Sequence, residues 1–132
     1  MLLSLAPDKT DCMLDDGLSD QERLILYARK TFDYIYSNPS IVKISILSDF
    51  KDYKPKGNSV LTQKGFQLAL RGKMPESRKK QIAFSLASIM QTAFLSGENS
   101  EQITGYKLQN KKQRDKFISD TVTMLMGGTD ER

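Results

Sequence analysis

The chain has 132 residues, about the size of one domain, and 39% of them are hydrophobic while 27% are charged. It has no histidine and a single cysteine, so the usual general base, the commonest zinc ligand and any internal disulfide are missing. No stretch approaches the roughly 20 apolar residues of a membrane span, and residues 1–6 are too short an apolar run for a signal peptide. We therefore expect a cytoplasmic, non-enzymatic protein that binds no metal or cofactor and no membrane.

The charges are unevenly distributed along the chain. Residues 1–22 carry a net charge of −5 and residues 51–80 a net charge of +7, while the whole chain carries +4. This asymmetry has two interpretations: a solvated surface with an acidic tail, or a site for nucleic acid or an acidic protein. In the second interpretation, the polyanion-binding residues are Lys54, Lys56, Arg78, Lys79 and Lys80.

Residues 1–18 show no hydrophobic periodicity, so we expect them to form a flexible acidic arm before the first helix. Ser19 and Glu22 have the spacing of a capping box, which marks a helix start. Leu24, Ala28 and Phe32 then recur at helical spacing. Since the residue before a proline is disfavoured in the α conformation, Pro39 ends this helix, which is predicted over 20–37.

Residues 41–47 fit two patterns. Val42, Ile44 and Ile46 alternate as in a strand and are β-branched. Val42, Ile46 and Phe50 also follow the i, i+4, i+8 spacing of a helix. No other segment offers a partner strand, and an isolated strand is not stable, so we predict a helix.

The rest of the chain continues the helical pattern. A basic loop over 52–58 precedes a helix that begins at Ser59 or Thr62 and ends near residue 71, with Gly72 in a left-handed cap. A helix over 75–96 is apolar on more than one face, and a polar connection leads to a last helix over 109–126. The prediction is an all-α, single-domain bundle of about five main helices over 19–128, with a tail over 129–132.

The sequence offers little catalytic chemistry. It has no histidine to serve as the base of a serine nucleophile and no glycine-rich phosphate loop, and Cys12 lies beside Asp11, which disfavours a thiolate. The interpretation that remains is a binding protein.

Large aromatic side chains are numerous for a small helical core. They pack the interior in one interpretation and line an apolar ligand pocket between helices in the other. The predicted pocket residues are Tyr27, Phe32, Tyr36, Phe50, Phe66 and Phe84.

The last two long helices carry more apolar surface than one small bundle can cover, which indicates a homodimer closed as a four-helix bundle. The predicted interface residues are Ala83, Ala87, Met90, Phe94, Val122 and Met124. For the core itself, we expect Phe32, Leu86, Ile89 and Val122 to be buried.

A helix that ends in Tyr34-Ile35-Tyr36-Ser37-Asn38-Pro39 before the apolar residues 41–44 resembles the C-terminal regulatory domain of TetR-type transcriptional repressors. The apolar helix over 82–95 and the final helix, which ends at Gly127-Gly128, resemble the closing helices of that domain. The resemblance covers about residues 19–128 and implies a ligand pocket among the middle helices and dimerisation through the last two. The helix-turn-helix domain of the family has no counterpart in residues 1–18.

Two hypotheses of function follow. The first is a regulatory domain, involved in transcription regulation, that senses a small apolar or amphipathic ligand and homodimerises. The alternative is a phage or viral accessory protein whose basic face over 51–80 binds nucleic acid or an acidic protein.

Overall fold

A computed structural model describes residues 17–127, and these residues form helices and turns without a strand. The helices are α2 (Asp20–Ser37), α3 (Pro39–Lys51), α4 (Asn58–Ala69), α5 (Glu76–Leu95), the 3-10 turn η2 (Gly97–Asn99), α6 (Ser100–Thr104) and α7 (Lys111–Gly127). The predicted all-α bundle of five main helices is confirmed for the described part of the chain. The expectations for the acidic arm and the tail lie almost entirely outside it.

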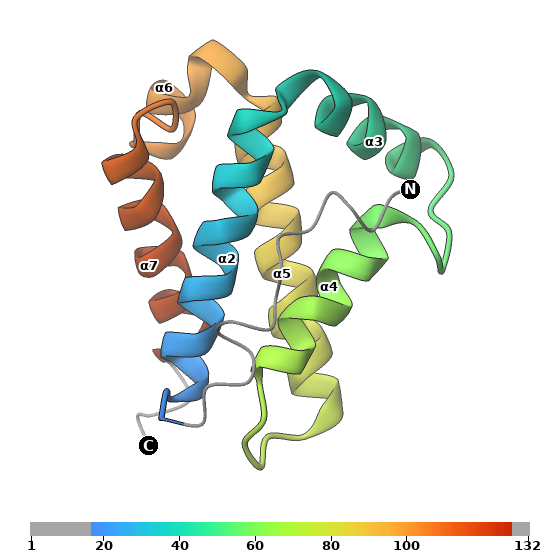
Figure 1. Cartoon of the computed structure of the whole chain (residues 1–132), viewed down its shortest axis with the longest axis vertical. Coiled ribbons are helices and arrows are strands. Elements are labelled where there is room, and N and C mark those ends of the chain that lie inside the picture. The colour runs from blue at the N-terminus through green and yellow to red at the C-terminus, as the bar shows by residue number, and fades with distance from the viewer. Residues whose placement is uncertain (1–16, 128–132) are drawn as a thin grey trace.

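Helix α2 is the central element, with α7 on one side, α4 on the other and α5 behind it (Figure 1). Its inward stripe includes Leu24, Tyr27, Ala28 and Phe32, at the spacing of one helix face. The predicted capping box is present, because the Glu22 N–H donates to Ser19 Oγ over 3.1 Å and the Ser19 N–H donates to Glu22 Oε1 over 2.9 Å.

Helix α3 begins directly after the Asn38–Pro39 break and covers one end of the bundle on the α4 side (Figure 1). The helical prediction for residues 41–47 is confirmed. Val42 and Ile46 face the core, whereas Phe50 is 51% exposed, so the predicted stripe is right at two of its three positions. Ile41, Ile44 and Leu47 are also exposed, which leaves an uncovered apolar ridge along α3.

The start of α2 is joined to the end of α4 and the residues after it through polar contacts, of which the one made by Arg23 is buried. Arg23 is 3% exposed, and its Nε donates to the Ala69 carbonyl over 3.0 Å. The Asp20 carboxylate accepts hydrogen bonds from the Arg71 N–H at 3.1 Å and the Gly72 N–H at 2.8 Å. The left-handed cap predicted at Gly72 is absent, since among the described residues the glycines with positive φ are Gly97 and Gly105. A Cβ at Gly72 would lie 2.8 Å from Asp20 Oδ2, so close approach is the constraint there.

The core lies between α2, α4, α5 and α7. Phe32, Leu86 and Val122 are fully buried, as predicted, while Ile89 is half-buried at the edge of a surface groove. Phe32 packs edge-on against Tyr36 at 5.1 Å and stacks on Phe117 at 6.0 Å between ring centroids.

Candidate ligand cleft and interface

The structure does not bring together the six aromatic residues predicted to form a ligand pocket. Tyr27, Phe32 and Phe66 are fully buried, and the Tyr27 and Phe66 rings meet edge-on at 5.6 Å. Phe50 and Phe84 lie on outward faces, and Phe84 is 54% exposed. Of the six, Tyr36 lines a surface cleft. The single aromatic pocket was a wrong prediction, because most of these rings pack against one another or face outward.

The predicted dimer residues also need correction. Ala83, Ala87, Met90 and Val122 are at most 1% exposed, and Phe94 is 9% exposed, because they face the other helices of the same chain. Met124 is 68% exposed and is the one residue of this set that is available to a partner.

The predicted polyanion residues lie in two separate places. Lys54 and Lys56 precede α4, and Arg78, Lys79 and Lys80 follow it in α5, so the 12 residues of α4 stand between the two groups (Figure 1). Lys54 pairs with Asp52 at 3.4 Å, and Lys79 pairs with Glu76 at 3.5 Å. They do not form one basic patch.

A small cavity of about 40 Å³ lies beneath α3, enclosed by residues of α2, α3, α4 and α5. Its polar groups satisfy one another. Asn58 Nδ2 donates to Ser45 Oγ over 2.6 Å, the Ser59 N–H donates to Asp49 Oδ2 over 2.7 Å, and Gln91 Nε2 donates to Ser59 Oγ over 2.6 Å. A cavity of this volume has room for water but not for a larger ligand. The network instead fastens α3 to α4 and α5.

A larger cleft of about 400 Å³ lies where α2 turns into α3. Its lining residues are Tyr36, Pro39, Ser40, Lys43, Phe94, Leu95, Gly97, Glu98 and Gln109. This volume is within the range of small-molecule sites, roughly 300–1,000 Å³. The cleft therefore has the size that the internal cavity lacks.

Aromatic contacts fix the apolar part of the cleft. The Tyr36 ring meets Phe94 edge-on at 5.3 Å, and the Arg114 guanidinium lies 4.9 Å from the centre of the same ring. Burial raises the pKa of Tyr36 to about 12, with Arg114 lowering it by a smaller amount, so the phenol is neutral at physiological pH. The Tyr36 hydroxyl has no hydrogen-bond partner within residues 17–127.

The cleft also carries opposite charges on separate elements. Lys43 comes from α3 and Glu98 from η2, and both side chains are exposed. Within the described part of the chain, neither forms an ion pair or hydrogen bond through its side chain. A ligand in this cleft thus meets an apolar floor and two uncompensated charges.

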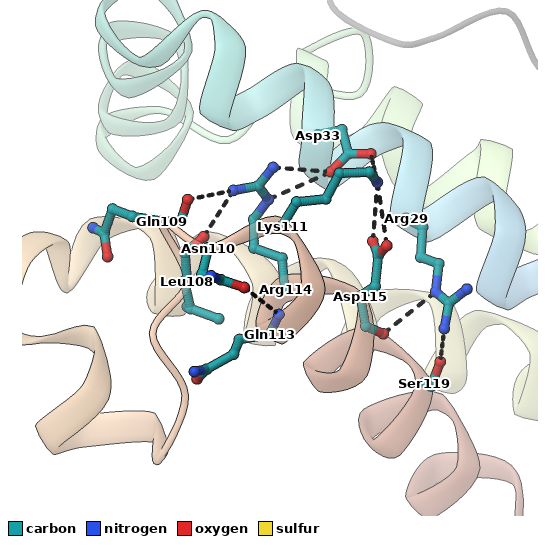
Figure 2. A network of polar contacts seen from close by, with 10 residues as sticks. All are labelled: Arg29, Asp33, Leu108, Gln109, Asn110, Lys111, Gln113, Arg114, Asp115 and Ser119. Atoms are coloured by element: carbon teal, nitrogen blue, oxygen red, sulfur yellow. Dashed lines mark hydrogen bonds and ion pairs between the residues drawn. The ribbon is translucent and has the colours of Figure 1, made fainter.

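Arg114 is held by a polar network that joins α2 to the start of α7 (Figure 2). Its Nη2 lies 3.1 Å from Asp33 Oδ1, and its Nη1 donates to the Leu108 and Gln109 carbonyls at 3.0 and 3.1 Å. Lys111 Nζ also reaches Asp33, at 2.8 Å. Each of these charges has a partner. The network therefore positions α7 and supports the Tyr36 ring.

A second groove of about 390 Å³ runs between α5, α6 and α7. It is lined by Ser88, Ile89, Thr92, Ala93, Ile103, Thr104 and Phe117. One of these lining residues, Ile103, is 64% exposed. Outside the lining, Phe84 on α5 is 54% exposed and Met124 on α7 is 68% exposed. No charged residue occurs between Lys80 and Glu98.

The sequence analysis missed Lys43, Leu95 and Glu98 in the cleft, because the α2–α3 corner brings them together from distant positions. A usable signal for the groove was the uncharged segment between Lys80 and Glu98, which includes α5 from Gln81 to its last residue.

Three further findings concern metal ions, membranes and similar proteins. The described residues contain no group of three or more His, Cys, Asp or Glu side chains arranged to hold a metal ion. None of the helices in residues 17–127 has the length and apolar character to cross a membrane. Searches of protein families, curated proteins and solved structures find no match to this chain. The resemblance to TetR-type regulatory domains therefore remains a prediction.

Proposed function

We propose that the protein is a non-enzymatic regulatory domain that works as a homodimer, with the outer face of α5 and α7 as the interface. The observation that carries the proposal is the uncharged part of α5 after Lys80, which presents the exposed Phe84 ring and lines an apolar groove together with exposed Ile103. Exposed apolar side chains and an apolar groove on one face favour an interaction surface.

A second copy fits this face better than an unrelated partner. A two-fold axis places the same face against itself, so a face with like charges at its centre would repel its mate. Here the centre is uncharged, and on α7 the nearby Lys116 and Asp120 carry opposite charges 3.0 Å apart. Helix α5 has 20 residues. In each copy, α5 and α7 side by side present a face of about 30 by 20 Å. Burying this face in both copies removes roughly 1,200 Å² from solvent, which is enough for a specific dimer.

The ligand-binding part of the proposal is supported by the cleft beside α3. The combination of a ligand-sized volume, an apolar floor and polar groups without partners is typical of a small-molecule site. An amphipathic ligand suits it better than a purely apolar one, since an apolar ligand would cover Lys43 and Glu98 without compensating their charges.

Molar mass in solution tests the dimer. Wild type should have twice the chain's 15.0 kDa at about 50 µM in light scattering. Phe84→Glu should have the mass of a monomer, because two buried carboxylates would face each other across the axis. Ile44→Glu is the matched control, since Ile44 is 70% exposed on α3 and outside the proposed interface. A monomeric wild type, or a dimer lost in Ile44→Glu and kept in Phe84→Glu, would contradict the proposal.

The alternative, binding of nucleic acid or an acidic protein through residues 51–80, has weaker support, because the basic residues are divided between two ends of α4. Fluorescence anisotropy with a labelled DNA duplex at low and high salt tests it. Binding that weakens steeply with salt would favour the alternative over the regulatory domain.

A further inference from the structure

We propose that the cleft at the α2–α3 corner binds a zwitterion of the amino-acid class. The ligand's carboxylate would pair with Lys43, its ammonium group with Glu98, and its apolar side chain would cover Phe94, Leu95 and Tyr36. This proposal rests on the ligand-binding part of the proposed function and names the chemistry of the ligand.

The pair of opposite charges selects against ligands with one charge. A simple carboxylate would gain an ion pair with Lys43 but would bring its negative charge toward Glu98. A simple amine would meet Lys43 in the same unfavourable way. Because specificity is a difference between affinities, a zwitterion is preferred over both.

The apolar part of the cleft is already in place for a ligand. Phe32, Phe94 and Arg114 contact the Tyr36 ring from different elements, and Gln109 Nε2 donates to the Gly97 carbonyl over 3.3 Å at the rim. A wall that does not have to reorganise lowers the entropic cost of binding. The Tyr36 phenol is a neutral group at physiological pH and offers a hydrogen-bond donor without adding a charge.

Three probes share a phenyl ring and differ in charge: L-phenylalanine carries both charges, phenylacetate only the negative one and 2-phenylethylamine only the positive one. Amide chemical shifts of the full chain, followed by NMR during each titration, report the dissociation constants and the site. We expect L-phenylalanine to shift the amides of Tyr36, Lys43, Leu95 and Glu98, and to bind at least about tenfold more tightly than either singly charged probe.

Charge-removing variants test the assignment of each charge. Lys43→Gln should weaken L-phenylalanine about tenfold and leave 2-phenylethylamine no weaker, while Glu98→Gln should do the same for L-phenylalanine and leave phenylacetate no weaker. Lys51→Gln is the control, because Lys51 is exposed on the same helix but does not line the cleft.

The absence of a shift at about 10 mM L-phenylalanine would overturn the proposal, and so would equal binding of all three probes. Equal loss of L-phenylalanine affinity in Lys51→Gln would also overturn it, because a general loss of positive charge would then explain the effect. Light scattering on the same samples reports the dimer independently, so failure of the ligand chemistry is distinguishable from failure of the proposed dimer.

Discussion

At the residue scale, Arg114 connects three features: α2, the turn before α7 and the floor of the cleft. Its side chain is 11% exposed and bonds to Asp33 and to two backbone carbonyls while covering the Tyr36 ring. Hydrogen bonds to charged groups contribute roughly 1.5–3 kcal/mol each when a partner would otherwise be left unpaired.

We therefore expect Arg114→Ala to lower the free energy of unfolding by about 2–3 kcal/mol in urea denaturation. Arg114→Lys should recover only part of this loss, because an ammonium group cannot reproduce the guanidinium fork. Lys111→Ala is the control: Lys111 also pairs with Asp33, but its side chain is 64% exposed, so the loss should stay below about 1 kcal/mol. Equal losses in Arg114→Ala and Lys111→Ala would contradict this account of the network.

Because of Tyr36, we expect the free energy of unfolding to fall with rising pH in the alkaline range. Its pKa is about 12 in the folded chain, against an ordinary value of 10.0, so the folded protein holds the phenolic proton more tightly. Its contribution to stability is complete below pH 10 and is lost as the pH rises through 12. Because Tyr36 is only partly buried, solvent screening keeps this contribution well below the roughly 1.4 kcal/mol per pKa unit of a fully shielded group.

Tyr36→Phe should remove this part of the alkaline loss. Urea denaturation near pH 9 and near pH 11.5 measures the difference for wild type and variant. Identical losses in the two proteins would show that the Tyr36 phenol does not titrate as its burial implies.

At the element scale, Gly65 sets how closely α4 approaches α2. A Cβ at this position would lie 2.7 Å from Tyr27 Oη and 2.9 Å from Tyr27 Cε2, and Tyr27 is 1% exposed. Gly65→Ala would raise helix propensity by about 1 kcal/mol, but overpacking a core costs about 1–3 kcal/mol.

We expect Gly65→Ala to be a net loss of stability in thermal or urea denaturation. Gly127→Ala is the matched control, because nothing lies within 4 Å of a Cβ at Gly127 in the last turn of α7. A stabilised Gly65→Ala protein would mean that α4 and α2 are farther apart than the structure places them.

The positions of the helices along the chain could be predicted from the sequence, whereas the face that each helix buries could not. Local signals such as the Ser19–Glu22 capping box and the Asn38–Pro39 break are read within a few residues, and the structure confirms both. Phe84 and Ala83 are neighbours on an apolar helix, yet one is 54% exposed and the other is fully buried. Which face turns inward depends on the neighbouring helices, and single-sequence periodicity does not carry that information when a helix is apolar on several faces.

The cleft is harder to predict for the same physical reason. Lys43 and Glu98 are 55 positions apart, and they line one cleft because α3 and η2 meet at the same end of the bundle. Tyr36, by contrast, lies beside the Asn38–Pro39 break, so its position at the corner was predictable from the chain itself.

At the scale of the whole molecule, α5 contributes residues to the core, to the groove beside α7 and to the proposed ligand cleft. Its buried side chains, including Leu86 and Met90, pack the core, Ser88 and Thr92 line the groove, and Phe94 and Leu95 belong to the cleft. The proposed dimer face and the proposed ligand cleft therefore both include residues of α5.

The claim tested most directly is that a second copy covers the outer face of α5 and α7. An isotope-filtered NOE measurement on a mixture of ¹³C-labelled and unlabelled chains reports only contacts between copies. We expect contacts between copies at the Phe84 ring and at the methyl groups of Ile89, Ile103 and Met124. Contacts confined to Ile41, Ile44 and Leu47 on α3, or none between copies, would contradict the account.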